Sequence, residues 1–334
     1  MIFNSNLFNN QNKIVDIFDK LYTQVIDKNK FLAKIRFYSL QRFSIRVIVN
    51  LLIPLYFILT KNNNEAKPPN KKFHSPKLIV SLTTFPARIS RVWIVIESLL
   101  RQTHKPDEII LWLSKDQFDS IDKLPKKLRK QQKNGLDIRL CSGDLKSHKK
   151  YYYTLQQYPE DFLITVDDDI IYHTTMIAEL VELNKKYPRS ICCHRASYIK
   201  TKNDKILPYL DWGVINSKQG PSYNIFQTSG GGTIYPPHSL HCEVLNDKVF
   251  KQNCFYADDV WLNIMSQLNG TTVVKADYNS VLLPVINFNN VKLSSINVTL
   301  GKNDKQLDDV RNYYIEKLGV DAFANCLKGE FLRS

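Results

Sequence analysis

Residues 162–170, FLITVDDDI, are the most informative stretch of this chain. A short apolar run with the character of a buried strand leads directly into three aspartates. Adjacent carboxylates at the end of a strand repel one another unless a cation neutralises them, and their hard oxygen atoms suit Mg²⁺ or Mn²⁺. Alternate side chains of an extended chain point the same way, so we expect Asp167 and Asp169 to bind the metal while Asp168 faces elsewhere. The alternative is a solvated acidic turn.

Strands and helices alternate around this stretch. Further strands are expected at 78–84, 108–113 and 137–141, and helices at 91–102 and 145–159. This alternation indicates the α/β class, with a mainly parallel central sheet flanked by helices. In such a sheet ligands bind outside the carboxyl ends of the strands, which is where the three aspartates lie. No GxGxxG follows the first strand and no GxxxxGK[ST] occurs, which argues against a dinucleotide cofactor and against P-loop ATP hydrolysis.

The composition is that of a folded protein whose positive charge is unevenly distributed. The 334 residues, 43% of them hydrophobic, are enough for one large α/β domain with additions or for two small domains. The net charge is +14, and residues 1–77 alone hold 13 Lys and Arg against 4 Asp and Glu. That part carries no nucleic-acid-binding signature, so we expect an anionic membrane surface as its partner and no nucleic acid. The six cysteines form no CxxC pair, and we expect reduced, mostly buried thiols in a cytosolic protein.

Residues 1–60 are expected to form a basic and apolar helical arm. Its run VIVNLLIPLYFIL (47–59) follows two arginines and is shorter than the ~20 apolar residues that a spanning helix needs. We therefore expect a helix that lies on, or dips into, the inner face of the membrane; the alternative is a helix packed on the following domain. Residues 61–76 are polar, contain three prolines and are expected to link the arm to a single domain at 77–334.

Five segments of the chain, taken in order, resemble a known family. They are SLTTFPARI, ESLLRQTHKPDEIILWLS, the aspartates at the strand end, TSGGGTIYPP and ADDVW. Over roughly residues 76–310 the chain is similar to bacterial GT-A glycosyltransferases, closest to the family-2-like enzymes of capsule, lipopolysaccharide and other surface-polysaccharide clusters.

The resemblance implies a GT-A fold, a nucleotide-sugar donor with Mn²⁺ or Mg²⁺ on its diphosphate, and inverting transfer to a hydroxyl of a glycan or glycolipid acceptor. Independently of the resemblance, the arm and the cysteines predict a cytoplasmic enzyme that is peripheral or monotopic on the inner face of the bacterial membrane. A retaining transferase, a nucleotidyltransferase that makes the activated sugar, and a glycan-binding scaffold without activity are the alternatives.

Donor-binding roles follow from the resemblance together with side-chain chemistry. Thr83 and Arg88, in the loop after the first strand, are expected at the nucleotide, where Arg88 can make a bidentate contact with a phosphate or base. An ordinary salt bridge from Arg88 to Glu97 or Asp116 is the alternative. Lys149 is expected to contact a phosphate, or else to lie on a solvated helix face.

The aspartate motif and the glycine-rich segment supply further donor-binding candidates. In the superfamily the first two positions of the motif often touch ribose or sugar hydroxyls, which implicates Asp167 and Asp168, and the last position carries the metal. Gly231 and Gly232 offer backbone that a donor or acceptor sugar can approach closely. Trp212 is expected either to stack on a sugar or, more simply, to pack in the core.

A second acidic pair, Asp258 and Asp259, is expected to act on the acceptor. Inverting transfer needs a carboxylate that takes the proton of the attacking hydroxyl. By resemblance Asp259 is this base, and Asp258 stands where the family has a glutamate and helps to position the acceptor. The alternative is that both acids only stabilise the start of a helix. The polar run 303–306 is a further candidate to close over the donor.

Overall fold

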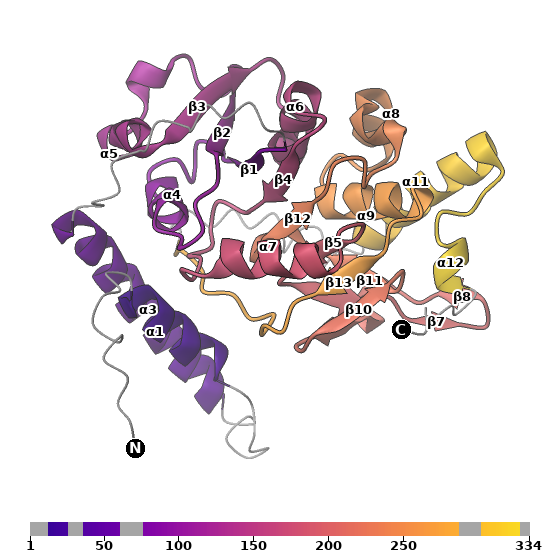
Figure 1. Ribbon diagram of the computed structural model, residues 1–334, viewed down its shortest axis with the longest axis horizontal. Helices are drawn as coiled ribbons and strands as arrows, with labels where there is room; N and C mark the ends of the chain where they lie inside the picture. Colours follow the sequence, from indigo (N-terminus) through magenta and orange to yellow (C-terminus); the bar gives the residue numbers. More distant parts are fainter. Residues whose placement is uncertain (1–12, 26–35, 61–75, 287–301, 328–334) are drawn as a thin grey trace.

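The computed structural model describes residues 13–25, 36–60, 76–286 and 302–327 (Figure 1). Its centre is an eight-stranded sheet with the order β10-β13-β5-β12-β4-β1-β2-β3. All of its strands run in one direction except β12 and β10, so the predicted α/β fold with a mainly parallel sheet is confirmed. The strands of this sheet are β1 (Leu78–Thr83), β2 (Glu108–Ser114), β3 (Leu136–Cys141), β4 (Phe162–Thr165), β5 (Ile191–Cys193), β10 (Gln219–Ser222), β12 (Thr233–Tyr235) and β13 (Val273–Lys275).

Strand β1 shows why the sheet lies at the centre. Its sequence LIVSLT is almost wholly apolar, as expected of a parallel strand covered on both faces. Val80 is in register with Ile109 of β2 and Ile164 of β4, and the three side chains share one core. The neighbouring Ile79 packs on the opposite face, where Tyr153 lies against it. Successive residues of β1 therefore stabilise both layers of the domain.

Helices cover both faces of the sheet (Figure 1). Helices α4 and α7 contribute to the core on one face, and α6, α8, α9 and α11 to the core on the other. The helices of this domain are α4 (Val92–Leu100), α5 (Lys126–Lys130), α6 (Lys149–Gln157), α7 (Met176–Lys186), α8 (Asp247–Asn253), α9 (Asp258–Leu268), α11 (Lys302–Leu318) and α12 (Ala324–Leu327). Two small antiparallel sheets follow β5 in the chain. The first contains three strands, β6 (Ala196–Tyr198), β9 (Gly213–Ile215) and β11 (Ile225–Gln227). The second contains β7 (Thr201–Lys202) and β8 (Lys205–Ile206).

Two of the expected elements differ in ways that affect the site. The helix expected at 145–159 begins as a 3₁₀ turn, Lys146–His148, and becomes α6 only at Lys149. Strand β4 ends at Thr165, so the three aspartates lie beyond the strand in a turn. Side chains alternate in direction only along an extended chain, and these residues are not part of one. The argument that the first and third aspartates point the same way therefore does not hold.

The N-terminal arm contains two described helices, α1 (Lys13–Thr23) and α3 (Phe37–Leu59), which pack on each other beside α4 (Figure 1). One face of α3 is buried against the domain through Val49, Asn50, Ile53 and Phe57. The apolar residues of this face belong to the same core as β1. On this face α3 is therefore packed on the domain, as the alternative predicted. The predicted linker at 61–76 lies outside the described residues except for residue 76.

The opposite face of α3 is apolar and exposed. Leu51, Leu55 and Leu59, spaced by one helical turn, are 67%, 50% and 73% accessible to solvent. The run predicted at 47–59 is thus only the second half of a helix of 23 residues, which is long and apolar enough to cross a membrane. Helices buried in soluble proteins and signal sequences meet the same two criteria.

The six cysteines form no disulfide, and five of them are buried; Cys242 is exposed. Cys192 and Cys193 lie next to each other in β5. Both thiols are fully covered, because β5 is paired with a strand on each side and has a core on each face.

Candidate active site

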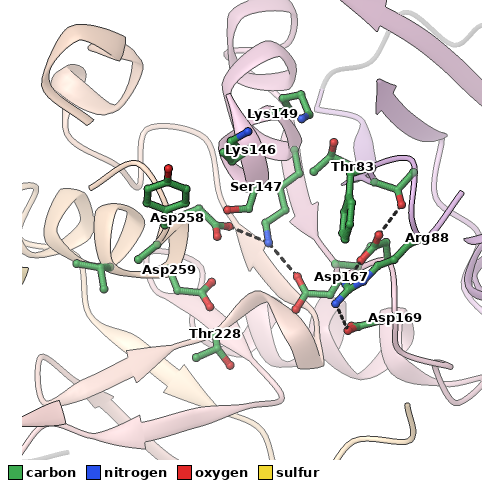
Figure 2. Close-up of a pocket in the computed structure, with 18 of the residues that line it drawn as sticks. Thr83, Arg88, Lys146, Ser147, Lys149, Asp167, Asp169, Thr228, Asp258 and Asp259 are labelled. Atoms are coloured by element: carbon green, nitrogen blue, oxygen red, sulfur yellow. Dashed lines mark hydrogen bonds and ion pairs between the residues drawn. The ribbon is translucent and has the colours of Figure 1, made fainter. Parts of the chain in front are cut away.

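A pocket of about 510 Å³ opens at the carboxyl ends of β1 and β4 (Figure 2). One side is lined by the loop after β1 and by the turn that begins α6. The other side is lined by the first turn of α9 and by residues of the small antiparallel sheet. The three aspartates after β4 lie between these two sides. The pocket therefore brings together chain segments that are far apart in sequence, at the sheet edge where a ligand is expected.

The three aspartates have different partners. Asp168 is buried and accepts from Thr84 Oγ1 and Arg88 Nη1, both at 2.5 Å. Asp169 lies 3.0 Å from the other terminal nitrogen of Arg88, so one guanidinium serves two neighbouring carboxylates. Asp167 turns away from them and accepts from Lys150 Nζ at 2.9 Å. Only Asp168 is enclosed: the side chains of Asp167 and Asp169 are 38% and 32% exposed, against 8% for Asp168.

Lys150 connects the two acidic groups of the pocket. Its ammonium lies 2.9 Å from Asp167 and 2.8 Å from Asp258, and the side chain is 4% exposed (Figure 2). Ser81 of β1 donates to the Lys150 carbonyl at 2.5 Å, which fixes this turn of α6 against the sheet. Burial lowers the pKa of Lys150, but the surrounding carboxylates outweigh it and hold the pKa well above its usual value. The ammonium is therefore a permanent positive charge between the two acidic groups.

The residues Asp258 and Asp259 begin α9, as the helix-start alternative anticipated. Asp258 pairs with Lys150, and Asp259 Oδ1 accepts from the backbone N–H of Ser229 at 3.0 Å and from its hydroxyl at 2.9 Å. Burial raises the pKa of Asp259 to about 7, and the charge of Asp258 adds to this. Burial also opposes ionisation of Asp258, but Lys150 holds its pKa below the usual value. Two adjacent aspartates thus have opposite proton affinities, which is how paired acids take different roles.

Comparison with known proteins decides the family. Residues 83–250, half of the chain, match the model of the family described as Glycosyl transferase family 2. The chain belongs to this family. It is therefore a glycosyltransferase with a GT-A fold, and all of the expected donor-binding and metal-binding residues lie within the matched segment. The acidic pair at the start of α9 lies outside it.

Solved structures of similar fold are more distant. S. aureus TarS, residues 1–349 in complex with UDP, is 13% identical, with a TM-score of 0.39 over 77% of this chain and 76% of that chain. Apo UDP-glucose pyrophosphorylase is 8% identical, with a TM-score of 0.34 over 72% and 98%. The UTP-bound UGPase from Acinetobacter baumannii is 10% identical, with a TM-score of 0.36 over 71% and 93%. No curated protein sequence matches the chain.

The side of the pocket next to β1 and α6 contains the residues expected to contact the donor. Thr83 and Arg88 both line it. The Thr83 hydroxyl donates to the Trp112 carbonyl at 2.8 Å, and Arg88 pairs with the aspartates rather than with Glu97 or Asp116. Lys149 also lines the pocket, where its ammonium lies 2.5 Å from Asp144. Its side chain is buried, so the alternative prediction, that Lys149 lies on a solvated face of the helix, is wrong.

The glycine-rich segment of the transferase lies behind the pocket. Gly231 and Gly232 are buried, and neither is among the described residues that line the pocket. A Cβ on Gly231 would lie 2.8 Å from the backbone nitrogen of Arg195, and Gly232 has φ +91° with Met176 Sδ 2.8 Å from the position of its Cβ. Packing therefore explains both glycines. The segment contributes to the pocket through Thr228, which lines it, and through Ser229, which holds Asp259.

Two further candidates have clear positions. Trp212 is 7% exposed, donates to the Leu207 carbonyl and packs on Phe226, so its role in the core is sufficient. Asn303 lines the pocket from the start of α11. In the same turn Gln306 accepts from the backbone N–H of Tyr256 at 3.0 Å. The polar run at 303–306 thus reaches the side of the pocket formed by the start of α9.

Within the described part of the chain, a group of metal-type ligands also occurs away from the pocket, at His173, Glu179 and His194. Thr175 donates to Glu179 at 2.6 Å, and His194 lies 2.9 Å from the same carboxylate. His173 contacts the Thr175 hydroxyl at 3.1 Å. Hydrogen bonding around the start of α7 accounts for this arrangement, and none of the three residues lines the pocket.

Proposed function

We propose that this glycosyltransferase moves a sugar from a nucleotide-diphosphate donor to a hydroxyl of a glycan or glycolipid acceptor, with inversion and with a divalent metal, in surface-polysaccharide biosynthesis. One observation carries the proposal. Two carboxylate groups with different partners face one pocket, and Lys150 alone connects them among the described contacts. The group after β4 suits the diphosphate and its metal, and the group at α9 suits the acceptor.

The charge of the pocket supports a divalent cation. The aspartates of its lining outnumber the cations by one; they are Asp144, Asp167, Asp168, Asp169, Asp258 and Asp259. The cations of the lining are Arg88, Lys146, Lys149, Lys150 and Arg195. A diphosphate would add negative charge to a lining whose own charges nearly balance. The donor set therefore fits Mg²⁺ or Mn²⁺, which prefer oxygen ligands.

Asp167 and Asp169 are the residues that would hold the ion. Their carboxylates are the exposed ones of the triplet, whereas Asp168 is fully engaged by Thr84 and Arg88. Burial and the neighbouring carboxylates raise the pKa of Asp169 to about 7, so a nearby cation would favour its ionised form. A bound divalent ion supplies Lewis-acid stabilisation of the departing diphosphate. Asp168 and its two partners fix the turn that carries both ligands.

Asp259 suits the base on the acceptor side. A general base works best when its pKa lies near the working pH, and burial brings the pKa of Asp259 to about 7. The two hydrogen bonds from Ser229 fix Oδ1, which leaves Oδ2 to take a proton from an acceptor hydroxyl. Asp258 stays ionised beside Lys150 and suits the positioning of the acceptor.

Thr83, Arg88 and Lys149 are proposed to contact the donor. All three line the pocket on the side of the loop after β1 and the start of α6. Arg88 and Lys149 are engaged by carboxylates, so a donor phosphate would share each cation with the aspartate that now neutralises it. Gly231 and Gly232 are proposed to act through the backbone that holds Ser229 and Arg195, not by direct contact with a sugar.

Screening donors for release of nucleoside diphosphate, with Mn²⁺ or Mg²⁺ present, tests the proposal. Transfer should release nucleoside diphosphate and require an acceptor. A nucleotidyltransferase would instead consume nucleoside triphosphate and release pyrophosphate, and a silent scaffold would release neither. The anomeric configuration of the new glycosidic bond, determined by NMR and compared with that of the donor sugar, separates inversion from retention.

We also propose that the arm holds the enzyme on the inner face of the membrane. The exposed stripe of α3, made of Ile48, Leu51, Leu52, Leu55, Ile58 and Leu59, has no partner among the described residues that covers it, and large contiguous apolar patches mark interaction surfaces. The basic N-terminal part supplies the attraction to anionic lipid. Because the other face of α3 is buried in the domain, this helix suits an interfacial position rather than a free transmembrane span.

Flotation with lipid vesicles tests the membrane proposal. The full chain should float with vesicles that contain an anionic lipid. A variant with Leu51, Leu55 and Leu59 replaced by Ser should remain in the soluble fraction, because it loses exposed apolar area without touching the buried face. Replacement of exposed Ser44 by Ala provides a control on the same helix. Equal flotation of the Leu→Ser variant would contradict the proposal.

A further inference from the structure

Asn50 is a polar residue on the buried face of an otherwise apolar helix. It is 8% exposed, and its neighbours on that face, Val49 and Ile53, are fully buried. Burying an amide without hydrogen bonds destabilises a fold, so a buried Asn is expected to have specific partners. Helical structure alone does not call for it, because Leu or Ala would form this turn of α3 more readily.

The side chain of Asn50 binds an extended segment of the catalytic domain. Its Nδ2 donates to the Pro284 carbonyl at 3.0 Å, and its Oδ1 accepts from the Ile286 N–H at 2.8 Å. A side-chain amide pairs in this way with alternate peptide groups along one edge of an extended chain. Both a donor and an acceptor are needed, and Asn offers both on a short side chain.

The opposite edge of the same segment holds the aspartate motif. Val285 N–H donates to the Asp169 carbonyl at 2.7 Å, and Ile171 N–H donates to the Leu283 carbonyl at 2.9 Å. Ile170 and Pro284 form an antiparallel bridge between these bonds. Residues 283–286 therefore lie between α3 and the turn that carries Asp169, and hydrogen bonds join them on both sides.

A second arm contact reaches the same region. Asp16 of α1 accepts from the backbone N–H and the hydroxyl of Thr174, at 2.8 and 2.6 Å. Thr174 lies five residues after Asp169, before α7 begins. Helix α3 thus binds the segment that is paired with Ile170, and α1 binds the chain that follows Ile170.

We propose that Asn50 is a positioning residue for Asp169: it fixes segment 283–286, which in turn fixes the backbone of the metal-binding turn. The inference rests on the proposed role of Asp169 in metal binding. It makes the arm part of the catalytic machinery as well as an attachment to the membrane. A purely structural Asn50 would stabilise the docking of α3 without affecting the metal site more than any other arm contact does.

The test uses the full chain in detergent and compares Asn50→Leu with Thr60→Val. Asn50→Leu removes both bonds to segment 283–286, together with the bond from Nδ2 to the Arg46 carbonyl at 2.9 Å, and keeps the branched side-chain shape and the helix. Thr60→Val removes a different arm contact, the bond from Arg101 Nη1 to Thr60 Oγ1 at 2.9 Å. Asn50→Asp keeps the acceptor for Ile286 and loses the donor for Pro284, so it provides an intermediate variant if Asn50→Leu does not fold.

Two measurements are made on each variant. Mn²⁺ affinity, from the loss of the free-ion EPR signal, should weaken about tenfold in Asn50→Leu, because partners that orient metal ligands typically contribute 10–100-fold. Hydrogen exchange at the amides of Ile171, Val285 and Ile286 should be faster, since these are the bonds that Asn50 supports. Asn50→Asp should show smaller changes, and Thr60→Val should leave both measurements as in wild type.

The outcomes separate this inference from the proposed function. If wild type binds no Mn²⁺, the proposed metal site is wrong, and exchange at Ile171 and Val285 still decides whether Asn50 holds the turn. Unchanged exchange at those amides in Asn50→Leu would overturn the inference. So would equal losses of Mn²⁺ affinity in Asn50→Leu and Thr60→Val, which would reduce Asn50 to one docking contact among others.

Discussion

The aspartates after β4 and the aspartates at the start of α9 differ in surroundings rather than in chemistry. Two members of the first group are partly exposed in a turn beyond a strand, with a shared guanidinium beside them. In the second group, which begins a helix, Asp258 is buried and paired to Lys150, and Asp259 is half-buried and bound by Ser229. The pKa is raised to about 7 at both Asp169 and Asp259, so the partners distinguish the two groups. Two partly exposed carboxylates beside a guanidinium suit an ion and a phosphate, and a carboxylate fixed through one oxygen by Ser229 suits proton transfer. The following experiments test this difference.

Replacing Asp169 by Ala should have the largest effect. The variant should lose turnover and Mn²⁺-dependent binding of nucleoside diphosphate, because it removes an exposed ligand oxygen. Its melting temperature should stay close to that of wild type, since the Asp169 side chain supports no described contact other than Arg88. Chelation of wild type with EDTA should produce the same loss, restored by added Mn²⁺. Activity that survives thorough chelation would rule out the metal.

Replacing Asp259 by Asn should lower kcat by about 10²–10⁴-fold, the usual contribution of a general base. Donor and Mn²⁺ affinity should change little, because this carboxylate lies on the acceptor side. Measuring both quantities for Asp259→Asn and Asp169→Asn assigns the two sites, since only the second variant should bind the donor more weakly. Near-normal turnover of Asp259→Asn would reduce this residue to a helix cap. The base would then have to be Asp258, or the mechanism a retaining one.

Replacing Lys150 by Met should destabilise the fold by about 3–5 kcal/mol, because it leaves carboxylates without their buried partner. Chemical denaturation measures the change. Lys149→Met is a matched control on the next residue, and its loss should be smaller because Lys146 also pairs with Asp144. Equal losses in the two variants would show that the connection between the acidic groups adds nothing to stability.

The pH dependence of kcat should show the smallest effect. Because the pKa of Asp259 is raised to about 7, the base is protonated as the pH falls below 7, and kcat should fall about tenfold per pH unit. An ordinary aspartate would keep its activity down to about pH 4. The profile is measured at saturating Mn²⁺, because the pKa of Asp169 is also about 7 and a bound cation keeps this carboxylate ionised. A flat profile between pH 5 and 7 would contradict the assignment of Asp259.

Much of the fold follows from the sequence because its signals are local. The run LIVSLT and the apolar stretch before the aspartates are too uniformly hydrophobic to be anything but buried strands, and helical patterns between strands require parallel crossovers. The two acidic groups were also predicted, because a carboxylate cluster after a strand or at a helix start is visible in the chain itself. The structure places both in one pocket.

The counterions could not be predicted. In SHKK, the sequence does not show which lysine faces the sheet, because this depends on where the 3₁₀ turn becomes a helix. That boundary turns Lys150 toward Asp167 and Asp258 and leaves Lys149 to Asp144. The hydroxyl of Ser81 on β1, 69 residues from Lys150 in the chain, donates to the Lys150 carbonyl. This tertiary contact fixes the first turn of α6 against the sheet.

The arm shows the same limit on a larger scale. Its apolar run was visible, but one face of α3 is buried and the other is exposed, and hydropathy alone does not distinguish them. Asn50 was the one signal of a docked face, since a polar amide in such a run needs partners. Its partners in the catalytic domain are more than 230 residues away in the chain, and only the folded structure identifies them.

One ammonium shared by two acidic groups makes the two ends of the pocket thermodynamically linked. A ligand that draws Asp167 away leaves the charge of Lys150 to Asp258, and this shifts the proton affinity of Asp259 beside it. Linkage is reciprocal, so the protonation state on the acceptor side must in turn change the affinity for whatever occupies the donor side. The order in which substrates enter, and the number of protons exchanged with the buffer as they do, should therefore change when this one lysine is replaced.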